Sequence, residues 1–334
     1  KKSELSAGIS IEHSKITVNE YLDKWFEVSA KPRLKERTYE DYIEYMKRYV
    51  RPKIGSMMLS KIKPLDIQAI YTSMIKKGLA PRTVRYAHSI LSSAFKQAVK
   101  WQILSINPAT MADLPKNHRK EMKALSPEEA RQFLEAAKGD KWFIIFSMAI
   151  STGMRPEEYL GLQWKNVDLE RGTATIERVL VWKRKGGGWS LQEPKTSQSR
   201  RTVPLPTTLL KDLKAYRKEQ LKERLSLGAA YQNYDFVFAT EIGTPILPSN
   251  LMRRHYKPLL KKAGLSEKIR LYDLRHTCAT LLLAEGENPK VVSERLGHAT
   301  IVLTLDTYSH VLPSMQKSAT DKLEGILFKK KLKK

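Results

Sequence analysis

Two arginines, Arg155 and Arg275, lie where a helix is expected to begin. Arg155 stands between Gly153, which interrupts an apolar stretch, and Pro156, which suits the first turn of a new helix. Arg275 follows Asp273, which can cap a further helix. The beginning of a helix favours a bound anion, and two guanidinium groups can grip one phosphate. Taken singly, each arginine fits a structural ion pair or a solvated helix end at least as well.

Three further side chains could add a nucleophile and proton donors to such an anion site. Lys195 lies in the segment 193–201 (EPKTSQSRR), whose hydroxyl and cationic groups are typical of a hairpin tip. His298 follows Gly297, which is expected to end a helix, and Tyr308 comes ten residues later. A free tyrosine has a pKa of about 10, so it needs cationic, preorganised surroundings to attack at neutral pH. Singly, a solvated turn, a structural histidine and a core tyrosine are the ordinary interpretations.

The part of the chain that carries these residues predicts helices with a small sheet. Ser126 begins a capping box, and 142–150 is almost wholly apolar, as in a buried helix. The glycines at 186–188 suit a flexible turn between strands and lack the context of a phosphate loop. The expected strands and later helices are Thr173–Trp182, Trp189–Leu191, Arg201–Leu205 and Phe236–Ala239, with helices from Thr207 and from Ser249 onward.

The charge of the chain narrows the class of partner. Sixty Lys and Arg against 35 Asp and Glu give a formal net charge of +25 over 334 residues. Such an excess attracts polyanions, of which nucleic acid is the commonest, with an acidic membrane surface or simple solubility as alternatives. No signal peptide, long apolar run or lipidation motif is recognisable, so we expect a soluble intracellular protein without a membrane partner. Cys278 is the only cysteine, which excludes an intramolecular disulfide and paired-cysteine zinc motifs.

The first third of the chain predicts a small all-α domain of four helices. Thr17 can cap the first helix, Thr38 can open the second, Pro64 begins the third and Pro81 the fourth. Exposed basic residues are dense here, and we expect phosphate contacts rather than a merely solvated helical surface. The candidate DNA-binding residues of this domain are Lys47, Arg48, Lys76, Lys77, Arg82 and Arg85.

Five short motifs occur in a fixed order along the second half of the chain. They are T-G-x-R ending at Arg155, P-K-T-x-x-S-x-R around Lys195, D-L-R-H-T around Arg275, L-G-H ending at His298, and T-Y-S-H around Tyr308. Each motif is weak alone, but the five in order are specific. The sequence resembles the tyrosine recombinases, or phage-type integrases, and looks most like those of phages and conjugative transposons.

The resemblance implies a fold and a chemistry. It implies an N-terminal SAM-like, four-helix core-binding domain and a C-terminal mixed α/β catalytic domain, mostly helical with a small antiparallel sheet. Tyr308 would attack the scissile phosphorus to give a 3′-phosphotyrosyl link, and Arg155 and Arg275 would hold the phosphate. Lys195 would protonate the departing 5′-oxygen, and His298 would hydrogen-bond the phosphate or assist the tyrosine. A covalent link conserves the bond energy, so no cofactor and no metal are expected.

The resemblance also assigns supporting residues, with one departure. Glu158, three residues after Arg155, matches a supporting acidic position. The family usually has His or Lys three residues before the second arginine, whereas this chain has Tyr272. A phenol is a poor general base at neutral pH, so His276 or His298 could take part of that role. Arg200, next to the lysine motif, is a further candidate for DNA contact.

The expected organisation follows from these assignments. A flexible segment 1–15 precedes the core-binding domain 16–112, a linker 113–124 and the catalytic domain 125–310. Residues 311–334 are expected to form an amphipathic helix and a basic tail, the helix docking on a neighbouring subunit or on its own core. The expected partners are double-stranded DNA at the ends of the element, a Holliday junction, three further copies of the chain, and accessory DNA-bending or directionality proteins. The expected location is the bacterial cytoplasm, at the nucleoid.

The function that this implies is site-specific recombination, integrating and excising a mobile element through a Holliday junction. A non-catalytic DNA-binding regulator on the same fold is the alternative, and it predicts the loss of a catalytic residue. A type IB-like topoisomerase would share the chemistry but act as a monomer on any sequence. A generic RNA-binding protein would fit the charge and leave the five motifs unexplained.

Overall fold

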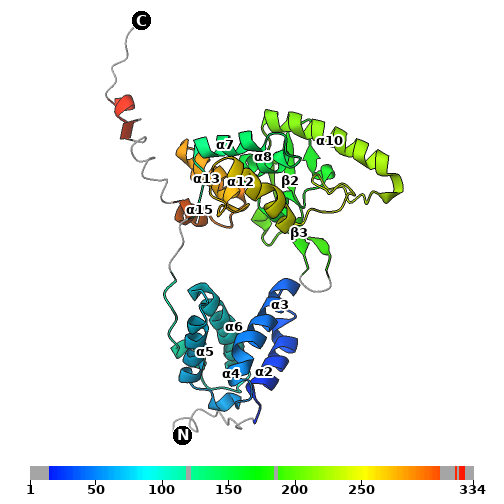
Figure 1. Ribbon diagram of the computed structural model, residues 1–334. Coiled ribbons are helices and arrows are strands. Elements are labelled where there is room, and N and C mark those ends of the chain that lie inside the picture. Colours follow the sequence, from blue (N-terminus) through cyan, green and yellow to red (C-terminus); the bar gives the residue numbers. More distant parts are fainter. Residues whose placement is uncertain (1–14, 118–121, 184–186, 309–319, 322, 328–334) are drawn as a thin grey trace. The chain divides into compact units, whose positions relative to one another are not determined.

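The computed structural model describes residues 15–117, 122–183, 187–308, 320–321 and 323–327 (Figure 1). The chain divides into two compact units, residues 1–120 and 121–334. The expected flexible segment 1–15 lies, except for its last residue, outside the described residues. Most of the expected C-terminal helix and tail, 311–334, lies outside them too, as do parts of the expected linker and of the triple-glycine turn.

The first unit is all helical. The longest helix of this unit, α6, buries Val84, Leu91 and Phe95 on one face, as their i, i+7 and i+11 spacing predicts. The helices of this unit are α2 (Val18–Trp25), α3 (Glu36–Tyr45), α4 (Arg51–Ile54), α5 (Pro64–Lys76) and α6 (Pro81–Lys100). Short π-helical stretches, Phe26–Ala30 and Met46–Val50, extend α2 and α3. The helices of this unit enclose one apolar core, so the unit forms a separate domain.

Of two helix starts predicted from the sequence in this unit, one is confirmed and one is wrong. Thr17 caps α2 in a reciprocal capping box with Glu20, as predicted. The prediction that Thr38 opens the second helix is wrong, because α3 begins two residues earlier at Glu36. The backbone of Lys35 turns from extended to helical there, and its carbonyl accepts the N–H of Thr38 at 2.8 Å. Thr38 therefore lies inside the first turn.

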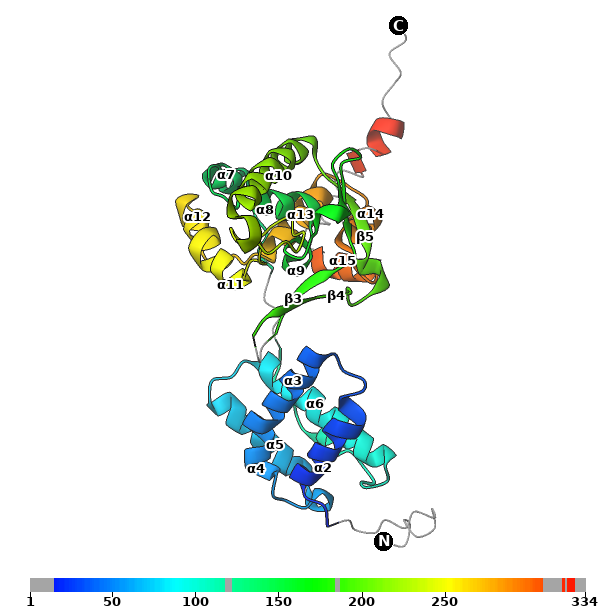
Figure 2. The ribbon, with the colours of Figure 1, turned by 90° about the vertical axis from the view of Figure 1, so that its right-hand side faces the viewer.

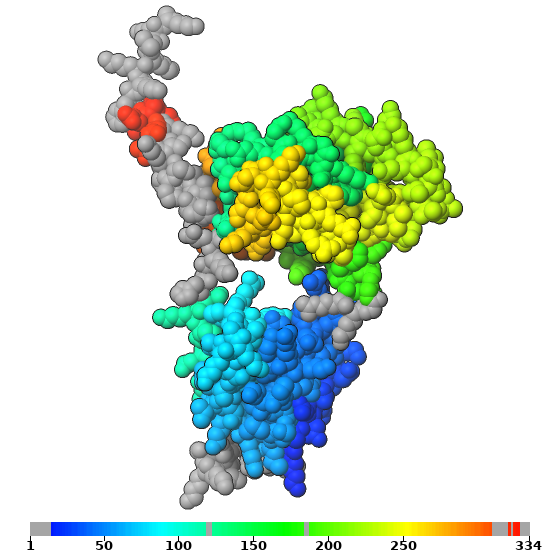
Figure 3. Space-filling view, in the orientation of Figure 1, coloured from blue at the N-terminus to red at the C-terminus, as the bar shows by residue number. Residues whose placement is uncertain are grey.

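The second unit is mostly helical with short strands. Its helices are α7 (Pro127–Ala137), α8 (Phe143–Thr152), α9 (Pro156–Tyr159), α10 (Thr207–Leu227), α11 (Pro248–Leu251), α12 (Lys257–Lys262), α13 (Asp273–Ala284), α14 (Pro289–Leu296) and α15 (Ile301–Tyr308). Ser126 caps α7 as predicted. Helix α12 lies beside α7 on the face of this unit that Figure 3 shows, in yellow next to green.

The strands form two small antiparallel sheets instead of the single continued sheet that the sequence predicted. One has the order β1 (Val167–Asp168), β2 (Thr173–Ile176), β5 (Arg201–Pro204), and the other pairs β3 (Val179–Trp182) with β4 (Trp189–Gln192). Figure 2 shows β3 and β4 side by side, apart from β5. Segment 193–200 therefore joins one sheet to the other and is not a hairpin tip. The strand expected at 236–239 is reduced to isolated bridges from Phe236 and Ala239.

Helices α8 and α13 form the centre of the second unit and set the positions of the polar residues. Helix α8 is buried on nearly all sides, as its apolar sequence predicts, and packs against α13. It ends at Gly153, whose φ of 67° is left-handed. A Cβ on Gly153 would lie 2.6 Å from Cδ2 of Leu296 and 3.3 Å from Sγ of Cys278. The helix end, α13 and α14 thus meet at a residue that has room for hydrogen only.

We expect Gly153→Ala to destabilise the second unit through both its backbone and its packing. The left-handed φ and the contact with Leu296 should together lower the free energy of unfolding by about 1–3 kcal/mol. Gly286 has a φ of 84° with nothing near its Cβ position, so Gly286→Ala isolates the backbone contribution. Urea unfolding should show the larger loss for Gly153→Ala. Equal losses in the two variants would mean that packing against Leu296 contributes nothing.

Candidate active site

Arg155 is held in place by a buried carboxylate. It occupies the residue before α9, where its backbone N–H donates to Oε2 of Glu158 at 2.8 Å. Its guanidinium donates to Oε1 of Glu158 at 2.6 Å and to the carbonyl of Gly297 at 3.2 Å. Burial lowers the pKa of Arg155, but the Glu158 carboxylate outweighs that effect and raises it overall. Arg155 is therefore a fixed cation whose side chain remains about one-fifth exposed, at 21%.

Arg275 is a buried cation with unused hydrogen-bond donors. Its side chain lies in α13 and is only 1% exposed, and its Nη1 donates to the carbonyl of Gly153 at 2.8 Å. Its Nε and Nη2 have no hydrogen-bond partner among the described residues. Burial and the nearby charge of Arg155 lower the pKa of Arg275 to about 10, which leaves it charged at neutral pH. Buried N–H donors without a partner are costly, and an anion would satisfy them.

His298 lies within the field of these arginines as a neutral ring. Gly297 ends α14 with a left-handed φ of 64°, as predicted, and turns the chain toward His298. The Nδ1 of His298 and Oγ1 of Thr304, in α15, are 2.7 Å apart and share a hydrogen bond. Burial, with the charges of Arg275 and Arg155, lowers the pKa of His298 to about 3. The ring is thus neutral at pH 7 and can donate or accept one hydrogen bond at its free nitrogen.

Tyr308, at the end of α15, is buried against the ring of His276. It is 1% exposed, and its hydroxyl lies 2.8 Å from Nδ1 of His276, with which it shares a hydrogen bond. Burial raises the pKa of Tyr308, and the charge of Arg275 opposes that rise. Burial also lowers the pKa of His276 to about 4, so at neutral pH the pair is a phenol and an uncharged imidazole. In this arrangement the hydroxyl is neutral and shielded from solvent.

Tyr272 lies at the rim of the cluster. It is the residue before α13, it is 37% exposed, and its ring centroid is 5.2 Å from that of His276. Because His276 shares a hydrogen bond with Tyr308, this ring contact places Tyr272 at the edge of the same site.

The prediction that Asp273 caps α13 is wrong. The carboxylate of Asp273 instead accepts the backbone N–H of Arg270 at 2.8 Å and pairs with the Arg270 guanidinium at 2.7 Å. It is therefore occupied by the turn that precedes the helix, and Tyr272 takes the N-cap position without a side-chain hydrogen bond.

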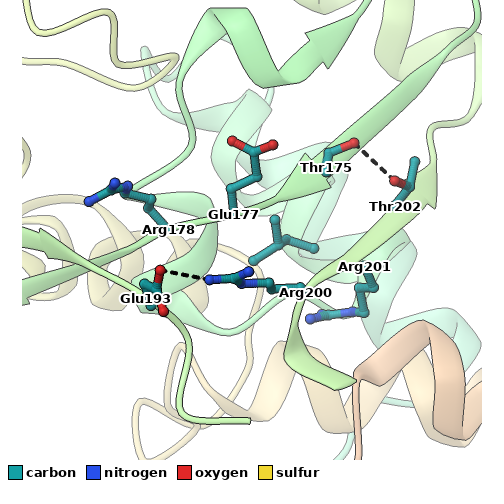
Figure 4. A pocket seen from close by; sticks show the side chains of 8 residues that line it. Thr175, Glu177, Arg178, Glu193, Arg200, Arg201 and Thr202 are labelled. Carbon is teal, nitrogen blue, oxygen red and sulfur yellow. Dashed lines mark hydrogen bonds and ion pairs between the residues drawn. The ribbon is translucent and has the colours of Figure 1, made fainter. Parts of the chain in front are cut away.

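Lys195 lies apart from this hydrogen-bonded cluster. It is exposed in the segment between β4 and β5, and no hydrogen bond or ion pair joins it to another described residue. Glu193 and Arg200 form an ion pair of 2.7 Å near the two ends of this segment. Figure 4 shows the pair across a cavity of about 400 Å³, with Thr175 and Thr202 behind it. The sequence predicted that Lys195 and Arg155 belong to one site, but the structure shows no hydrogen bond or ion pair between these two described residues.

The six basic residues expected to contact DNA in the first unit are all exposed. Arg85 also donates from Nε to the carbonyl of Pro115 at 2.8 Å, so it has a structural contact. No shared cluster among these six residues is recorded. Their exposure agrees with a DNA-contact role without establishing it.

The chain matches known proteins along nearly its whole length. Residues 17–84 match the N-terminal SAM-like domain of phage integrases, and residues 123–315 match the phage integrase family. The chain belongs to the phage integrase family. Its members are tyrosine recombinases, enzymes that transfer DNA strands, so the first unit is the SAM-like domain and the second is the catalytic domain.

Relatives and solved structures agree with this assignment. A tyrosine recombinase XerC-like protein of Caldanaerobacter subterraneus subsp. tengcongensis is 32% identical over 337 positions, covering 96% of this chain and 85% of the relative. The ICEBs1 integrase of Bacillus subtilis is 29% identical and covers 90% and 80%. The Tn1549 transposon integrase in complex with a circular intermediate DNA superposes with a TM-score of 0.78 at 22% identity, over 92% of this chain and 99% of that one, which shows the same fold.

Arg201 is the residue of this integrase site that sequence reasoning missed. It is the last position of the P-K-T-x-x-S-x-R motif, and its side chain is 8% exposed. It donates to both carboxylate oxygens of Glu158, at 2.9 and 3.1 Å, and to the carbonyl of Arg295 at 2.6 Å. Its place in the motif was the available signal, but its neighbour Arg200 was chosen instead.

Among the described residues, no helix has the length and apolar character needed to cross a membrane.

The two neutral histidines predict a pH dependence of stability. The unfolded chain takes up protons on His276 and His298 below about pH 6.5, whereas the folded chain resists protonation until about pH 4 and 3. The unfolded state therefore binds more protons in this window, and stability falls as the pH falls. Each histidine should contribute up to about 1.4 kcal/mol per pH unit between about pH 6.5 and 5.

Urea unfolding of the integrase at several pH values checks this expectation. His276→Asn and His298→Asn should each show a shallower loss of unfolding free energy from pH 6.5 to 5 than the unsubstituted protein. If all three proteins lose stability with the same slope, the histidines are not held neutral by the fold.

Proposed function

We propose that this integrase cleaves and rejoins DNA at specific sites through Tyr308, integrating and excising a mobile element. The observation that carries the proposal is the pair of buried nitrogens of Arg275, Nε and Nη2, that have no partner in the part of the chain that the structure describes, near the fixed guanidinium of Arg155. A scissile phosphate bound there would accept from both arginines. The negative charge that grows on the phosphate oxygens during attack would then be stabilised in a site with little water.

The nucleophile has a proton acceptor within reach. With Nδ1 unprotonated, His276 accepts the hydrogen of the Tyr308 hydroxyl across 2.8 Å. In the proposed step the bond from Oη of Tyr308 to phosphorus forms and the bond from phosphorus to the 5′-oxygen breaks. The 5′-oxygen takes a proton from Lys195, and the phenol proton passes to His276 or His298. Because Tyr308 is buried, we infer that DNA binding rearranges α15 and exposes the hydroxyl.

Tyr272 takes the position at which the family usually has His or Lys. Its exposed hydroxyl can donate a hydrogen bond to a phosphate oxygen held by Arg155 and Arg275. As a poor base at neutral pH it would leave proton transfer to the two histidines. The low pKa values of both rings keep them neutral in the absence of DNA, and the negative charge of a bound phosphate would raise these pKa values and make the rings better proton acceptors.

The DNA partners and the assembly are part of the proposal. A solved lambda integrase tetramer is bound to a Holliday junction, and we propose the same partner and number of copies for this chain. The SAM-like domain would span 16–112 and the catalytic domain 125–310, with the linker 113–124 between them. The tail 311–334 would dock on a neighbouring copy, and accessory DNA-bending or directionality proteins would assist. A bacterial cytoplasmic location follows from this role.

Buried Tyr308 is also compatible with the alternative, a DNA-binding regulator that does not cleave. The two functions differ in one product, a covalent protein–DNA adduct. The first experiment therefore uses nicked suicide duplexes with the candidate ends of the element, which trap such an adduct after cleavage.

Tyr308→Phe should abolish the adduct and leave DNA binding intact, because the change removes only the attacking oxygen. Denaturing gels of protein and labelled duplex measure the adduct, and a gel shift measures binding. Tyr234→Phe, at an exposed tyrosine outside the site, is the matched control and should form the adduct normally. Tight binding without any adduct from the unsubstituted protein would support the regulator. An adduct that survives in Tyr308→Phe would show that another residue is the nucleophile.

Basic residues of the SAM-like domain should contribute electrostatic affinity. Lys76→Gln with Lys77→Gln should weaken DNA binding and reduce the slope of log K against log salt by roughly 1.8, about 0.9 for each lost phosphate contact. Lys31→Gln is a control, because Lys31 is exposed in the same domain and already paired with Glu27 at 3.3 Å. Binding titrations between low and moderate salt give the slopes. An unchanged slope would place the DNA elsewhere on this domain.

A further inference from the structure

The carboxylate of Glu158 is shared by two arginines deep in the catalytic domain. It is 1% exposed, and each of its oxygens accepts one hydrogen bond from Arg155 and one from Arg201. Burial favours the neutral acid, but the hydrogen bonds and charge of Arg201, together with the charge of Arg155, hold the pKa of Glu158 below its usual range. A buried carboxylate stays charged only if such partners are kept.

Arg201 connects three parts of the chain through one planar group. Besides Glu158, its guanidinium binds the carbonyls of Arg295, at 2.6 Å, and Ser199, at 3.2 Å. It therefore ties the start of β5, which follows the segment that carries Lys195, to α9 and to the end of α14. These bonds use four of its five N–H groups, and the side chain is 8% exposed, so Arg201 is directed into the domain and not toward a DNA phosphate.

Gly297 packs directly against this side chain. A Cβ at residue 297 would lie 2.9 Å from Nη1 of Arg201 and 3.1 Å from its Cδ. The carbonyl of Gly297 accepts from Arg155, and His298 is the next residue. The position of Arg201 thus bears on both Arg155 and the turn that carries His298.

Arg200 and Arg201 are neighbours with different surroundings. Arg200 is 56% exposed and pairs with Glu193 across the cavity in Figure 4, whereas Arg201 is 8% exposed. A buried group with every nitrogen satisfied is suited to orienting other residues.

We propose that Arg201 is a positioning residue for strand cleavage, which fixes Arg155 through Glu158 and the His298 turn through Gly297. The proposal rests on the proposed function. Arg201→Lys keeps the charge but loses the planar fork, so it cannot bind both oxygens of Glu158 and the Arg295 carbonyl together. A displaced Arg155 would then stabilise the growing charge on the phosphate less well.

The test compares two suicide duplexes at saturating DNA, one with a normal scissile phosphate and one with a neutral methylphosphonate there. The methylphosphonate lacks one charged oxygen and depends less on Arg155. Arg201→Lys should form the adduct about 10–100-fold more slowly on the normal duplex. Its defect should shrink on the methylphosphonate, as should that of Arg155→Lys. DNA affinity should change less than about twofold, since Arg201 is 8% exposed and its hydrogen bonds are made within the domain.

Arg171→Lys is the matched control, because Arg171 is 87% exposed in the loop between β1 and β2. This variant should cleave both duplexes at the normal rate. The proposal would be overturned if Arg201→Lys formed the adduct at the normal rate, or if its adduct formation were slowed equally on both duplexes. If Arg201→Lys does not fold, Glu158→Gln with Arg201→Gln removes the buried carboxylate together with its more buried arginine partner and takes its place in the same comparison. If that variant does not fold either, Arg201 serves stability alone and the proposal fails.

Failure of the proposed function gives a separate result. The unsubstituted protein would then form no Tyr308-dependent adduct on the normal duplex. If both the unsubstituted protein and the Arg201→Lys variant are fully active, only the proposed positioning role of Arg201 is excluded.

Discussion

A carboxylate buried between two guanidinium groups fixes the geometry of this catalytic domain. Glu158 is removed from water, and removing either arginine would leave its buried charge with a single cationic partner. The constraint acts on distant parts of the sequence, because Arg201 also binds the carbonyl of Arg295 and packs against Gly297. Arg155, the start of β5 and the turn before His298 are therefore held in one arrangement.

Burial also sets the protonation states around the nucleophile. The arginines keep their charge, while His276 and His298 are neutral because desolvation and nearby cations both oppose protonation. Burial likewise keeps the Tyr308 phenol protonated. The same low-dielectric surroundings that would make the arginines effective toward a phosphate thus keep this phenol, the proposed nucleophile, uncharged.

The sequence predicted the folding class and the order of the elements well where local signals decide them. The capping boxes at Thr17 and Ser126, the proline starts of α5 and α6 and the apolar run of α8 all correspond to observed helices. It failed where alternative local partners compete for a helix start and where a strand chooses between distant partners. Thr38 and Asp273 could each cap a helix, but the backbone turns at Lys35 and the pairing of Asp273 with Arg270 give them other positions. Likewise, β5 pairs with β2 and skips β4, a choice that the spacing of strands does not contain.

The sequence by itself determined the family, the basic charge and the identity of the residues available for chemistry, because motif order and composition need no coordinates. Only the tertiary structure decided which of those residues meet. It joined Tyr308 to His276 and buried Arg275 with two free donors. It also made Arg201 a partner of Glu158, while Arg200 faces solvent. The reason is physical: burial and hydrogen-bond partners are properties of packed neighbours, and in this site hydrogen-bonded neighbours lie up to 142 positions apart in the chain.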